Sequence, residues 1–245
     1  MVENVFDLKA PEWDSSPYRA ERARAVAEAI RRRVPLSREM KAFEYGCGTG
    51  LLSFALQPYL GRITLAPYIF RAMALIGVRR RAGSNMFRHQ IGTLGILLDY
   101  KLIDPVLLKA SVIHDLFEDA LGLPGVSREE IVCIDDDGPA VYELVMEVTR
   151  QVVNGVREPK AVFLTRIMES GSRRARILKL ADRISNIFSL GFVHDEAFVR
   201  KYLMETRGFI LPYAKEINEN MFLELSDLVA DREHMLQQRL RTDHS

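Results

Sequence analysis

The chain has 245 residues and an ordinary globular composition: 48% of the residues are hydrophobic, 27% are charged, and the formal net charge is +1. Such a chain is long enough to bury a sizeable core in one or two domains. Because the net charge is nearly zero, the composition gives no electrostatic reason to expect nucleic acid or a membrane surface as the main partner.

Cysteine usage and hydropathy exclude two further classes of protein. The two cysteines, Cys47 and Cys133, do not form a CxxC pair, so we expect neither a disulfide framework nor a thiolate zinc site. No apolar run reaches the roughly 20 residues that span a bilayer. The acidic N-terminus, with Glu3 and Asp7, is not typical of a signal peptide. We therefore expect a cytoplasmic protein that does not bind membranes.

Residues 1–65 differ in pattern from the rest of the chain. The predicted elements are a basic, alanine-rich helix over residues 17–33, a strand over 41–45, a glycine-rich turn over 46–50 and a helix over 51–60. A strand, a glycine-rich turn and a helix in this order are typical of a nucleotide-binding cradle. The reason is that glycines let the backbone approach a ligand and the first amides of the helix point toward it.

The string from Phe43 to Leu52, together with Trp13-Asp14, resembles the opening of a class I S-adenosylmethionine-dependent methyltransferase. The resemblance stops early, because such folds need an acidic residue roughly 20 residues further on to hold the ribose hydroxyls. No aspartate or glutamate occurs between Glu44 and Asp99. We therefore predict a truncated, Rossmann-like βα segment that does not transfer methyl groups and serves as a structural appendage or an interaction arm. Whether the protein is a homo-oligomer is left open.

From residue 66 onward the apolar residues recur with the period of a helix, so the predicted fold class is mainly α, a helical bundle over residues 66–240. Asp104 and Pro105 are typical of the first positions of a helix, and Ser127 begins a capping box. The expected helices cover residues 68–76, 87–98, 105–120, 139–151, 173–189, 196–217 and 220–238, and residues 239–245 are expected to fray.

An acidic run from Asp135 to Gly138 precedes one of these helices. It could be mistaken for a calcium loop, but it lacks the alternating spacing and the distal glutamate of an EF-hand. We expect it to cap the helix over residues 139–151.

Residues 111–120 carry four polar side chains in an otherwise apolar stretch. On a continuous helix, His114 and Glu118 lie one turn apart on one edge. Asp115 and Asp119 form a parallel pair beside them. Three carboxylates and an imidazole repel one another when they are ionised, and burial raises that penalty unless a cation compensates. A divalent metal is one such cation; the alternative is a solvated acidic end of a helix.

A second polar group lies in the helix predicted over residues 173–189. Its members stand at positions i, i+3, i+4 and i+7, which places them on one face of the helix. They are Lys179, Asp182, Arg183 and Asn186. A stripe of this kind is either part of a site or a salt-bridge ladder on the surface, and the spacing alone does not decide between the two.

Two histidines and two aspartates together have the composition of a site for a hard divalent ion, without sulfur. They are His89, His114, Asp115 and Asp182. This donor set suits Mn²⁺ better than a structural zinc, and Mg²⁺, Fe²⁺ or Co²⁺ are harder to exclude. One histidine alone would more often be a core or surface residue, but the joint arrangement over three helices favours a metal site.

Four segments of the chain form a recognisable set: Arg80 to Gly83, His89, His114 to Asp119, and Lys179 to Asn186. In order and spacing they resemble the HD-type hydrolase domain of RelA/SpoT-like proteins, which degrade (p)ppGpp, the alarmone of the stringent response. The resemblance covers about residues 66–235. It has the size of the single-domain small alarmone hydrolases of the metazoan SpoT homologue type, and it implies an HD-domain helical bundle.

The resemblance implies a role for several residues. Those that would hold one Mn²⁺ are His89, His114, Asp115 and Asp182. Those that would activate and orient water are Glu118 and Asp119, and the presence of both implies an active hydrolase. The chain departs from the family at three places. Gln90 follows the first histidine where the family has proline, Ala82 precedes the glycine where the family has serine or aspartate, and residues 75–78 read Leu-Ile-Gly-Val where the family has HxGQ.

The same resemblance implies contacts with a guanine nucleotide alarmone as substrate. Arg80 would stack on the guanine, with Arg81 beside it, and Asn186 and Ser189 would contact the nucleoside. The cationic side chains that would offset the charge of the substrate are Arg80, Lys179 and Arg183.

These expectations combine into a metal-dependent hydrolysis of (p)ppGpp. Glu118 would accept a proton from a metal-activated water, and attack at the phosphorus next to the ribose 3′ oxygen would release pyrophosphate and leave GDP or GTP. Two alternatives stay open. In one, the same metal site acts on another nucleotide, such as the 2′-phosphate of NADPH or pppApp. In the other, the chain is an inactive fusion that serves as a binding module.

Overall fold

The computed structural model describes residues 17–42, 51–60, 62–63, 66–83, 85–119 and 126–242. The glycine-rich turn and most of the string that resembles a methyltransferase lie outside the described residues, so that resemblance stays a prediction. The chain divides into two compact units, Met1–Phe70 and Arg71–Ser245. Within the described part of the chain, no helix is long and apolar enough to cross a membrane.

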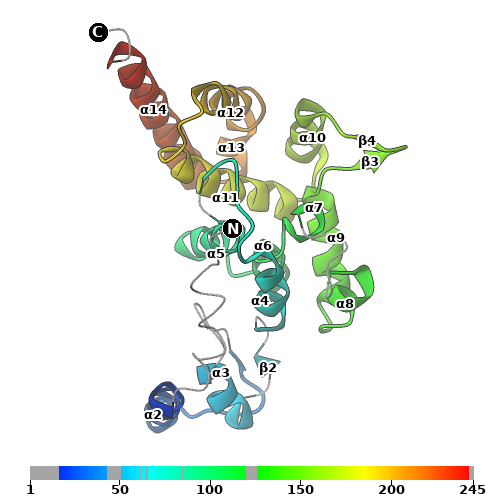
Figure 1. Ribbon diagram of the computed structural model, residues 1–245. Coiled ribbons are helices and arrows are strands. Elements are labelled where there is room, and N and C mark those ends of the chain that lie inside the picture. The colour runs from blue at the N-terminus through cyan, green and yellow to red at the C-terminus, as the bar shows by residue number, and fades with distance from the viewer. Residues whose placement is uncertain are drawn as a thin grey trace. The chain divides into compact units, whose positions relative to one another are not determined.

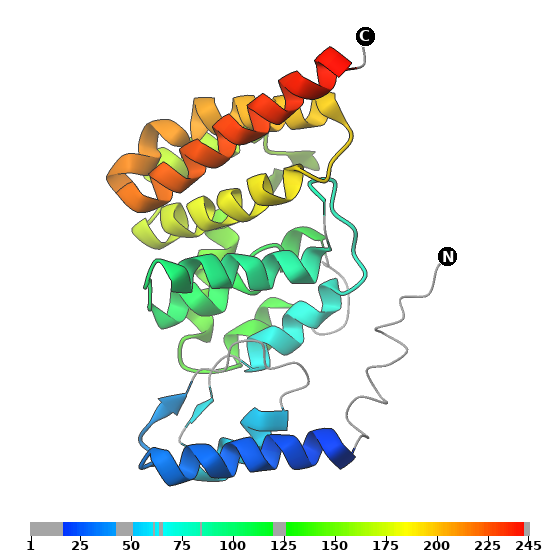
Figure 2. The same ribbon diagram turned by 90° about the vertical axis from the view of Figure 1, so that its left-hand side faces the viewer.

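The first unit contains the helix predicted over residues 17–33, which the structure confirms as α2 (Pro17–Arg33). The other elements are β1 (Lys41–Ala42), α3 (Leu51–Leu56), the 3₁₀ turn η1 (Gln57–Tyr59) and β2 (Arg62–Ile63). α2 packs against α3 (Figure 2), and the two strands pair in parallel with Lys41 opposite Arg62. Two short paired strands do not define a Rossmann-like sheet, so that part of the fold class stays a prediction.

The second unit is a bundle of helices, as the sequence predicts. In chain order α4 (Ala66–Ala72) and the 3₁₀ turn η2 (Met73–Leu75) precede it. The helices that follow are α5 (Met86–Asp99), α6 (Pro105–Ser111), α7 (Leu116–Asp119), α8 (Arg128–Val132), α9 (Gly138–Val148), α10 (Lys160–Thr165), the π-helical turn η3 (Arg166–Ser170), α11 (Arg173–Leu190), α12 (Glu196–Phe209), α13 (Leu211–Ile217) and α14 (Glu219–Thr242).

The central element of this bundle is α11. It packs against α5, α9, α12, α13 and α14, and most of its residues from Ala175 to Leu190 are buried. Figure 2 shows α11 (yellow) between α5 (green) and α14 (orange to red). Because the helix is covered on several sides, the polar residues that it carries lie inside the bundle and not on a solvated face, which excludes the surface salt-bridge ladder.

Side-chain caps fix the starts of the helices that carry the candidate site. Asn85 caps α5 and Asp104 caps α6, each by accepting a hydrogen bond from a first-turn amide, at 2.7 Å and 3.0 Å. Ser127 caps α8 and Ser172 caps α11 in the same way. The caps predicted at Asp104 and Ser127 are thereby confirmed.

Two helices that the sequence predicts as continuous are broken. The helix expected over residues 105–120 ends at Ser111, and the chain becomes helical again at Leu116. The helix expected over residues 196–217 is interrupted between α12 and α13. There Pro212 lies in the first turn of α13 and has no amide with which to continue the helical hydrogen bonds.

The C-terminal helix is longer than the sequence predicts. α14 extends to Thr242, so the fraying that was expected from residue 239 onward is wrong for residues 239–242. The reason is a tertiary contact: the guanidinium of Arg239 donates hydrogen bonds of 2.9 Å to the carbonyls of Gly191 and Val193 at the end of α11.

The acidic run before α9 supplies the cap residue of that helix, Asp137, as the sequence predicts. Asp137 occupies the cap position but makes no side-chain cap hydrogen bond. Instead, the ammonium of Lys109 lies 2.9 Å from Oδ2 of Asp135 and also pairs with Asp137. The Lys109 and Asp135 side chains are each 2% exposed. The carboxylates of this run therefore also act as counter-ions of a buried ammonium, a role that was not predicted from the sequence.

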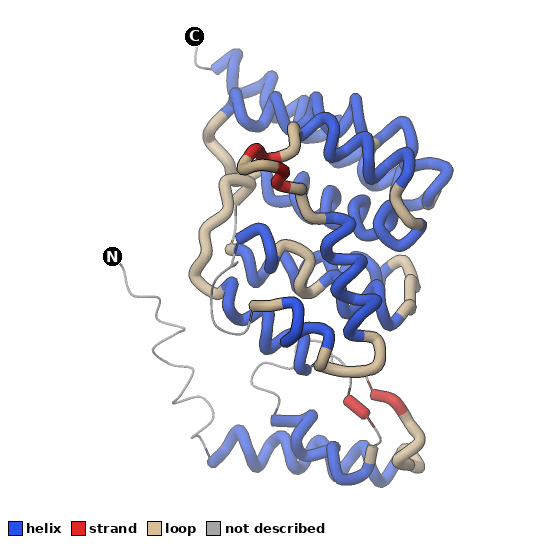
Figure 3. Tube along the Cα trace, turned by 90° about the vertical axis from the view of Figure 1, so that its right-hand side faces the viewer, coloured by secondary structure: helices blue, strands red, loops and turns tan. Residues whose placement is uncertain are grey.

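A β-hairpin that was not predicted lies between α9 and α10. It consists of β3 (Val152–Val153) and β4 (Val156–Arg157), paired antiparallel with Val153 opposite Val156. Its two-residue turn has positive φ at Asn154 (51°) and Gly155 (76°), the pair of conformations that an Asn-Gly turn adopts most readily. The hairpin extends away from the neighbouring helices (Figure 1; red in Figure 3).

Candidate active site

The turn between α6 and α7 places two of the predicted metal ligands. Nδ1 of His114 lies 2.7 Å from the carbonyl oxygen of Ser111, which in a continuous helix would accept the amide of Asp115. Because the histidine ring takes this acceptor, the helix ends at Ser111. The next turn begins with the amides of Glu118 and Asp119, which donate to the Asp115 carbonyl at 3.0 Å and 3.1 Å. The four polar side chains of this stretch therefore do not form one helical square.

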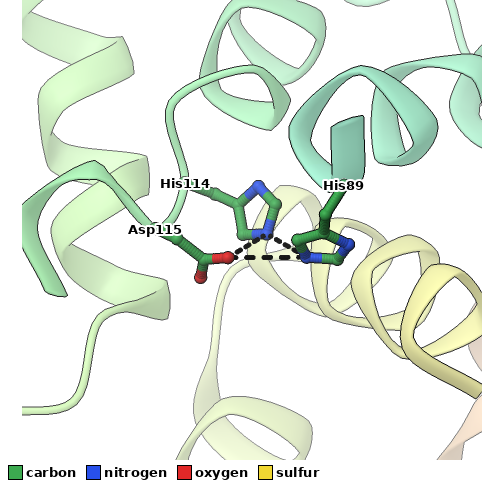
Figure 4. A group of neighbouring side chains, drawn as sticks. All are labelled: His89, His114 and Asp115. Carbon is green, nitrogen blue, oxygen red and sulfur yellow. Dashed lines mark hydrogen bonds and ion pairs between the residues drawn. The ribbon is translucent and has the colours of Figure 1, made fainter. Parts of the chain in front are cut away.

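Four predicted ligands meet inside the bundle, from α5, the α6–α7 turn and α11. Nε2 of His89 lies 3.2 Å from Nε2 of His114, 3.4 Å from Oδ2 of Asp115 and 3.1 Å from Oδ1 of Asp182. Nε2 of His114 lies 3.3 Å from Oδ2 of Asp115 and 3.7 Å from Oδ1 of Asp182. Figure 4 shows both rings and the Asp115 carboxylate turned toward one point.

The outer contacts of this cluster orient the rings. Nδ1 of His89 lies 2.8 Å from the Ser185 hydroxyl, and Nδ1 of His114 lies within hydrogen-bonding distance of the Ser111 carbonyl. A carbonyl can only accept, so Nδ1 of His114 donates, and in the neutral ring Nε2 presents its lone pair to the cluster. Histidine ligands of metal ions commonly have such outer contacts.

The geometry and chemistry of the cluster fit a divalent cation. Donor atoms that share one ion at about 2.0–2.2 Å lie roughly 3 Å apart in neighbouring positions. Nε2 of His89 and of His114 lie 3.2 Å apart, and each lies 3.1–3.7 Å from an oxygen of Asp115 and of Asp182. Both histidines are 3% exposed and Asp182 is 5% exposed. Two imidazoles and two carboxylates without sulfur suit Mn²⁺ and its neighbours in the first transition series.

The pKa shifts of the cluster residues indicate that positive charge is favourable at this point. Burial lowers the pKa of His114, but the adjacent carboxylates of Asp115 and Asp182 outweigh burial and raise it. Burial likewise opposes ionisation of Asp182, yet the Lys179 ammonium and the histidines hold its pKa well below the usual range. Both directions show that the carboxylates favour nearby positive charge, which Lys179 and His114 supply in the absence of a metal ion.

Glu118 and Asp119 lie beside the cluster but differ in their contacts. Oε1 of Glu118 accepts a hydrogen bond of 2.8 Å from the amide of Arg150, and Oε2 pairs with the guanidinium of Arg157. Asp119 is an exposed residue whose carboxyl is partly desolvated; this desolvation and the charges of Asp115 and Glu118 raise its pKa to about 6. The two residues that were predicted to handle water are therefore one ion-paired carboxylate and one carboxyl that titrates near neutral pH.

Cationic side chains surround the cluster at different depths. The ammonium of Lys179 donates to Oδ2 of Asp182 at 2.7 Å. Arg183 is fully buried, with its guanidinium 4.2 Å from the ring centroid of Tyr202. Its Nε and Nη2 have no hydrogen-bond partner. Both cations lie inside the bundle, so a contact of Arg183 with substrate phosphate would need a rearrangement.

The residues predicted to bind the nucleoside form a chain from the cluster to the loop before α5. Asn186 donates from Nδ2 to the backbone carbonyl of Asp182 at 2.9 Å, and its Oδ1 accepts from Arg80. Nη1 of Arg80 is buried without a hydrogen-bond partner. The loop itself packs tightly at Gly83, where φ is +86° and an added Cβ would lie 3.0 Å from the Ser189 carbonyl.

Two predicted substrate residues lie apart from the metal cluster. Arg81 donates to Asp195 at 2.9 Å and covers the ring of Phe198, 4.6 Å from its centroid, at the start of α12. The Ser189 hydroxyl donates to the Ser185 carbonyl at 3.2 Å. The described contacts of these two side chains are with residues other than the four candidate ligands.

Comparison with known proteins gives two kinds of similarity. No protein-family model matches the chain. Among curated proteins, it is 28% identical over 167 residues to "GTP pyrophosphokinase rsh" of Brucella melitensis biotype 1, and 30% identical over 168 residues to the proteins of that name in Brucella ovis and Brucella abortus. Each match covers 66% of this chain but only 21% of the relative.

A solved structure gives the second similarity. It is described as a metazoan ortholog of SpoT that hydrolyzes ppGpp and plays a role in starvation responses. The TM-score is 0.59 at 23% sequence identity, and the match covers 70% of this chain and 96% of that one. The fold is that of this SpoT ortholog.

Several residues of the site were not predicted from the sequence. Gln90, next to His89, donates from Nε2 to Oδ2 of Asp115 at 3.0 Å. Lys160 lies at the start of α10, where burial and the charges of Lys179 and Arg183 lower its pKa to about 8. The Asn-Gly turn signals the hairpin that holds Arg157, but nothing in the sequence pairs that arginine with Glu118.

Proposed function

We propose that the chain is a metal-dependent hydrolase of (p)ppGpp, with an HD-type site of the RelA/SpoT family in residues 66–240. The observation that carries the proposal is the convergence of four ligand atoms of the predicted types from three separate elements. The shared fold with a protein described as hydrolysing ppGpp, and the 30% identity to proteins named GTP pyrophosphokinase, support the choice of substrate class.

Mn²⁺ is the ion that we propose for the cluster of His89, His114, Asp115 and Asp182. When bound, such an ion neutralises phosphate oxygens and acidifies water. The protein supplies the rigidity of the site: the two histidines are held through Nδ1, and Asp182 is held by Lys179. Because these side chains are held in place, they would bind the ion at one defined position.

In the proposed reaction, Glu118 accepts a proton from the attacking water and Asp119 orients that water. The new bond joins the water oxygen to the phosphorus attached to the ribose 3′ oxygen, the bond from that phosphorus to O3′ breaks, and O3′ takes up a proton. The products are pyrophosphate and GDP from ppGpp, or GTP from pppGpp. The pKa of about 6 at Asp119 lets this carboxyl exchange protons near neutral pH.

We propose that the nucleotide binds along the chain of residues from the cluster to the loop before α5. Arg80, whose Nη1 lacks a partner, stacks on the guanine, and Asn186 and Ser189 contact the nucleoside. Lys179 and Lys160 place positive charge beside the phosphates. Arg81 would join the substrate only by leaving Asp195.

A panel of nucleotides tests the substrate. The full-length protein, loaded with Mn²⁺, is incubated separately with ppGpp, pppApp and NADPH at equal concentrations, and the products are separated by anion exchange. We expect GDP and pyrophosphate from ppGpp at a rate at least about tenfold above that of either other nucleotide. If only NADPH loses its 2′-phosphate, the metal site stands and the proposed substrate is wrong.

A further inference from the structure

The β3–β4 hairpin is held at its base and exposed at its tip. Three valines of its strands are 63% to 70% exposed, and the tip extends away from α9 and α10 (Figure 1). At the base, Glu158 pairs with Arg166 at 2.9 Å, and the Glu158 carbonyl accepts a hydrogen bond of 3.0 Å from Arg150. Few buried contacts restrain the strands themselves, so a small movement of this hairpin is inexpensive.

Arg157, the last residue of β4, brings a cation from this hairpin to the proposed water-activating residue. Its guanidinium pairs with Oε2 of Glu118, while Oε1 of Glu118 accepts the Arg150 amide at 2.8 Å. The Arg157 side chain is 50% exposed and that of Glu118 is 18% exposed. Both carboxylate oxygens are therefore engaged, and the more accessible member of the pair is the arginine.

A phosphate group is a strong competitor for this guanidinium. Arginine presents a planar fork of N–H donors that matches phosphate oxygens as well as a carboxylate. Two other cations of the site pair with carboxylates elsewhere: Lys179 with Asp182, and Arg81 with Asp195. The Arg157 side chain is half exposed, so it can change its partner at the surface, and Glu118 keeps the hydrogen bond from the Arg150 amide when it does.

We propose that Arg157 binds the released diphosphate, and that it leaves Glu118 for the terminal phosphate when substrate enters. The inference rests on the proposed function. In an in-line displacement the attacking water lies opposite the departing ribose oxygen. Glu118, and therefore Arg157, thus lies on the side of the attacked phosphorus that faces away from the nucleoside. The terminal phosphate is attached through an equatorial oxygen, so it can reach this side while the nucleoside cannot. The same exchange frees Oε2 of Glu118 to take the proton of the water.

Pyrophosphate binding tests the contact without relying on turnover. The full-length protein saturated with Mn²⁺ is titrated with pyrophosphate and, separately, with GDP in a calorimeter. We expect Arg157→Gln to weaken pyrophosphate binding about tenfold, the loss of one charge-assisted contact, and to leave GDP binding within about twofold. Arg173→Gln, which changes an exposed arginine of α11, is the matched control and should change neither affinity. Unchanged pyrophosphate binding in Arg157→Gln would overturn the proposal.

The exchange of partners makes a second, opposite prediction. If Glu118 competes with pyrophosphate for Arg157, Glu118→Gln should strengthen pyrophosphate binding by about three- to tenfold. That gain should disappear when Arg157→Gln is added, because the competition needs both side chains. If pyrophosphate still binds more tightly in the double variant, the gain is a general effect of charge. If Glu118→Gln alone does not tighten binding, Glu118 and pyrophosphate do not compete for Arg157. Either result would contradict the proposed exchange of partners.

The outcomes separate this inference from the proposed function. If the wild-type protein hydrolyses ppGpp and Arg157→Gln lowers kcat without weakening pyrophosphate binding, Arg157 only positions Glu118, and the proposed function survives. If the wild-type protein leaves ppGpp intact but binds pyrophosphate through Arg157, the anion contact stands and the proposed reaction is wrong.

Discussion

Single residues outside the ligand set give the candidate metal site its order. The carbonyl of Ser111 and the hydroxyl of Ser185 hold the two imidazoles through Nδ1, and Gln90 holds one carboxylate oxygen of Asp115. The ligand types could be predicted from the sequence because they form a spaced pattern. Their supporting contacts could not, since Ser185 meets His89 only after α5 and α11 have packed.

Loss of the Gln90 contact should weaken metal binding. Gln90→Leu keeps the size of the side chain but removes the hydrogen bond that orients Asp115. Because outer contacts of this kind typically contribute about 10- to 100-fold to metal affinity, we expect a fall in Mn²⁺ affinity of that order in a calorimetric titration. Gln237→Leu, at an exposed position of α14, is the control. Equal affinities of the Gln90 variant and the wild type would contradict the role.

The raised pKa of Asp119 predicts a pH-dependent gain in stability for Asp119→Asn in the protein freed of metal. The native pKa of about 6 lies above the ordinary 3.8, so the wild-type carboxyl favours folding below about pH 4, and this contribution is lost as the pH rises through about 6. Asparagine does not titrate. The difference in unfolding midpoint between variant and wild type should therefore grow between about pH 4 and pH 6 and then level off. A difference that is flat across this window would contradict the raised pKa.

At the scale of elements, local patterns predicted most of the helices and the caps at Asp104 and Ser127, but not α10 or the helix ends that depend on distant groups. Apolar periodicity and the Asp104 cap correctly begin α6. The end of that helix depends on the His114 ring taking the Ser111 carbonyl, which no periodicity reveals. The continuation of α14 past Gln238 likewise depends on Arg239 reaching the end of α11. The hairpin is different, because its Asn-Gly turn was visible in the sequence.

The buried ion pair between α6 and the acidic run should be important for stability. Lys109→Met leaves Asp135 buried without the ammonium that lies 2.9 Å away. Breaking one side of a buried pair destabilises proteins by about 3–5 kcal/mol, and we expect a loss of that order in urea unfolding. The double variant Lys109→Met, Asp135→Leu should recover part of it. A loss below about 1 kcal/mol in the single variant would show that the pair contributes little.

At the scale of the whole molecule, the candidate site lies within one of the two compact units. All four candidate ligands, Glu118 and the residues proposed to bind substrate lie in Arg71–Ser245. The residue types of the candidate site could be predicted from the sequence, because they occur in the order and at the spacing of the motifs of a known domain. The geometry could not, because three elements must pack before Nε2 of each histidine comes within 3.1–3.7 Å of an oxygen of Asp115 and of Asp182. The predicted boundary at residue 65 stays a prediction.

A shortened chain that begins at Ala66, the first residue of α4, tests this division. We expect it to unfold cooperatively, to bind Mn²⁺ and to keep kcat/KM for ppGpp within about threefold of the full chain, since no proposed site residue is removed. Urea unfolding followed by circular dichroism provides the control for folding. A folded fragment that has lost Mn²⁺ binding would show that residues 1–65 contribute to the site.

The most direct test of the proposed hydrolase is the product analysis of ppGpp with purified full-length protein and Mn²⁺. We predict equimolar GDP and pyrophosphate. Chelation of the metal, Asp182→Ala and Glu118→Gln should each lower the rate at least about 100-fold, since each removes a part on which the reaction depends. If the metal-loaded wild-type protein leaves ppGpp unchanged, or if Asp182→Ala hydrolyses it at the wild-type rate, the proposed reaction at this site is wrong.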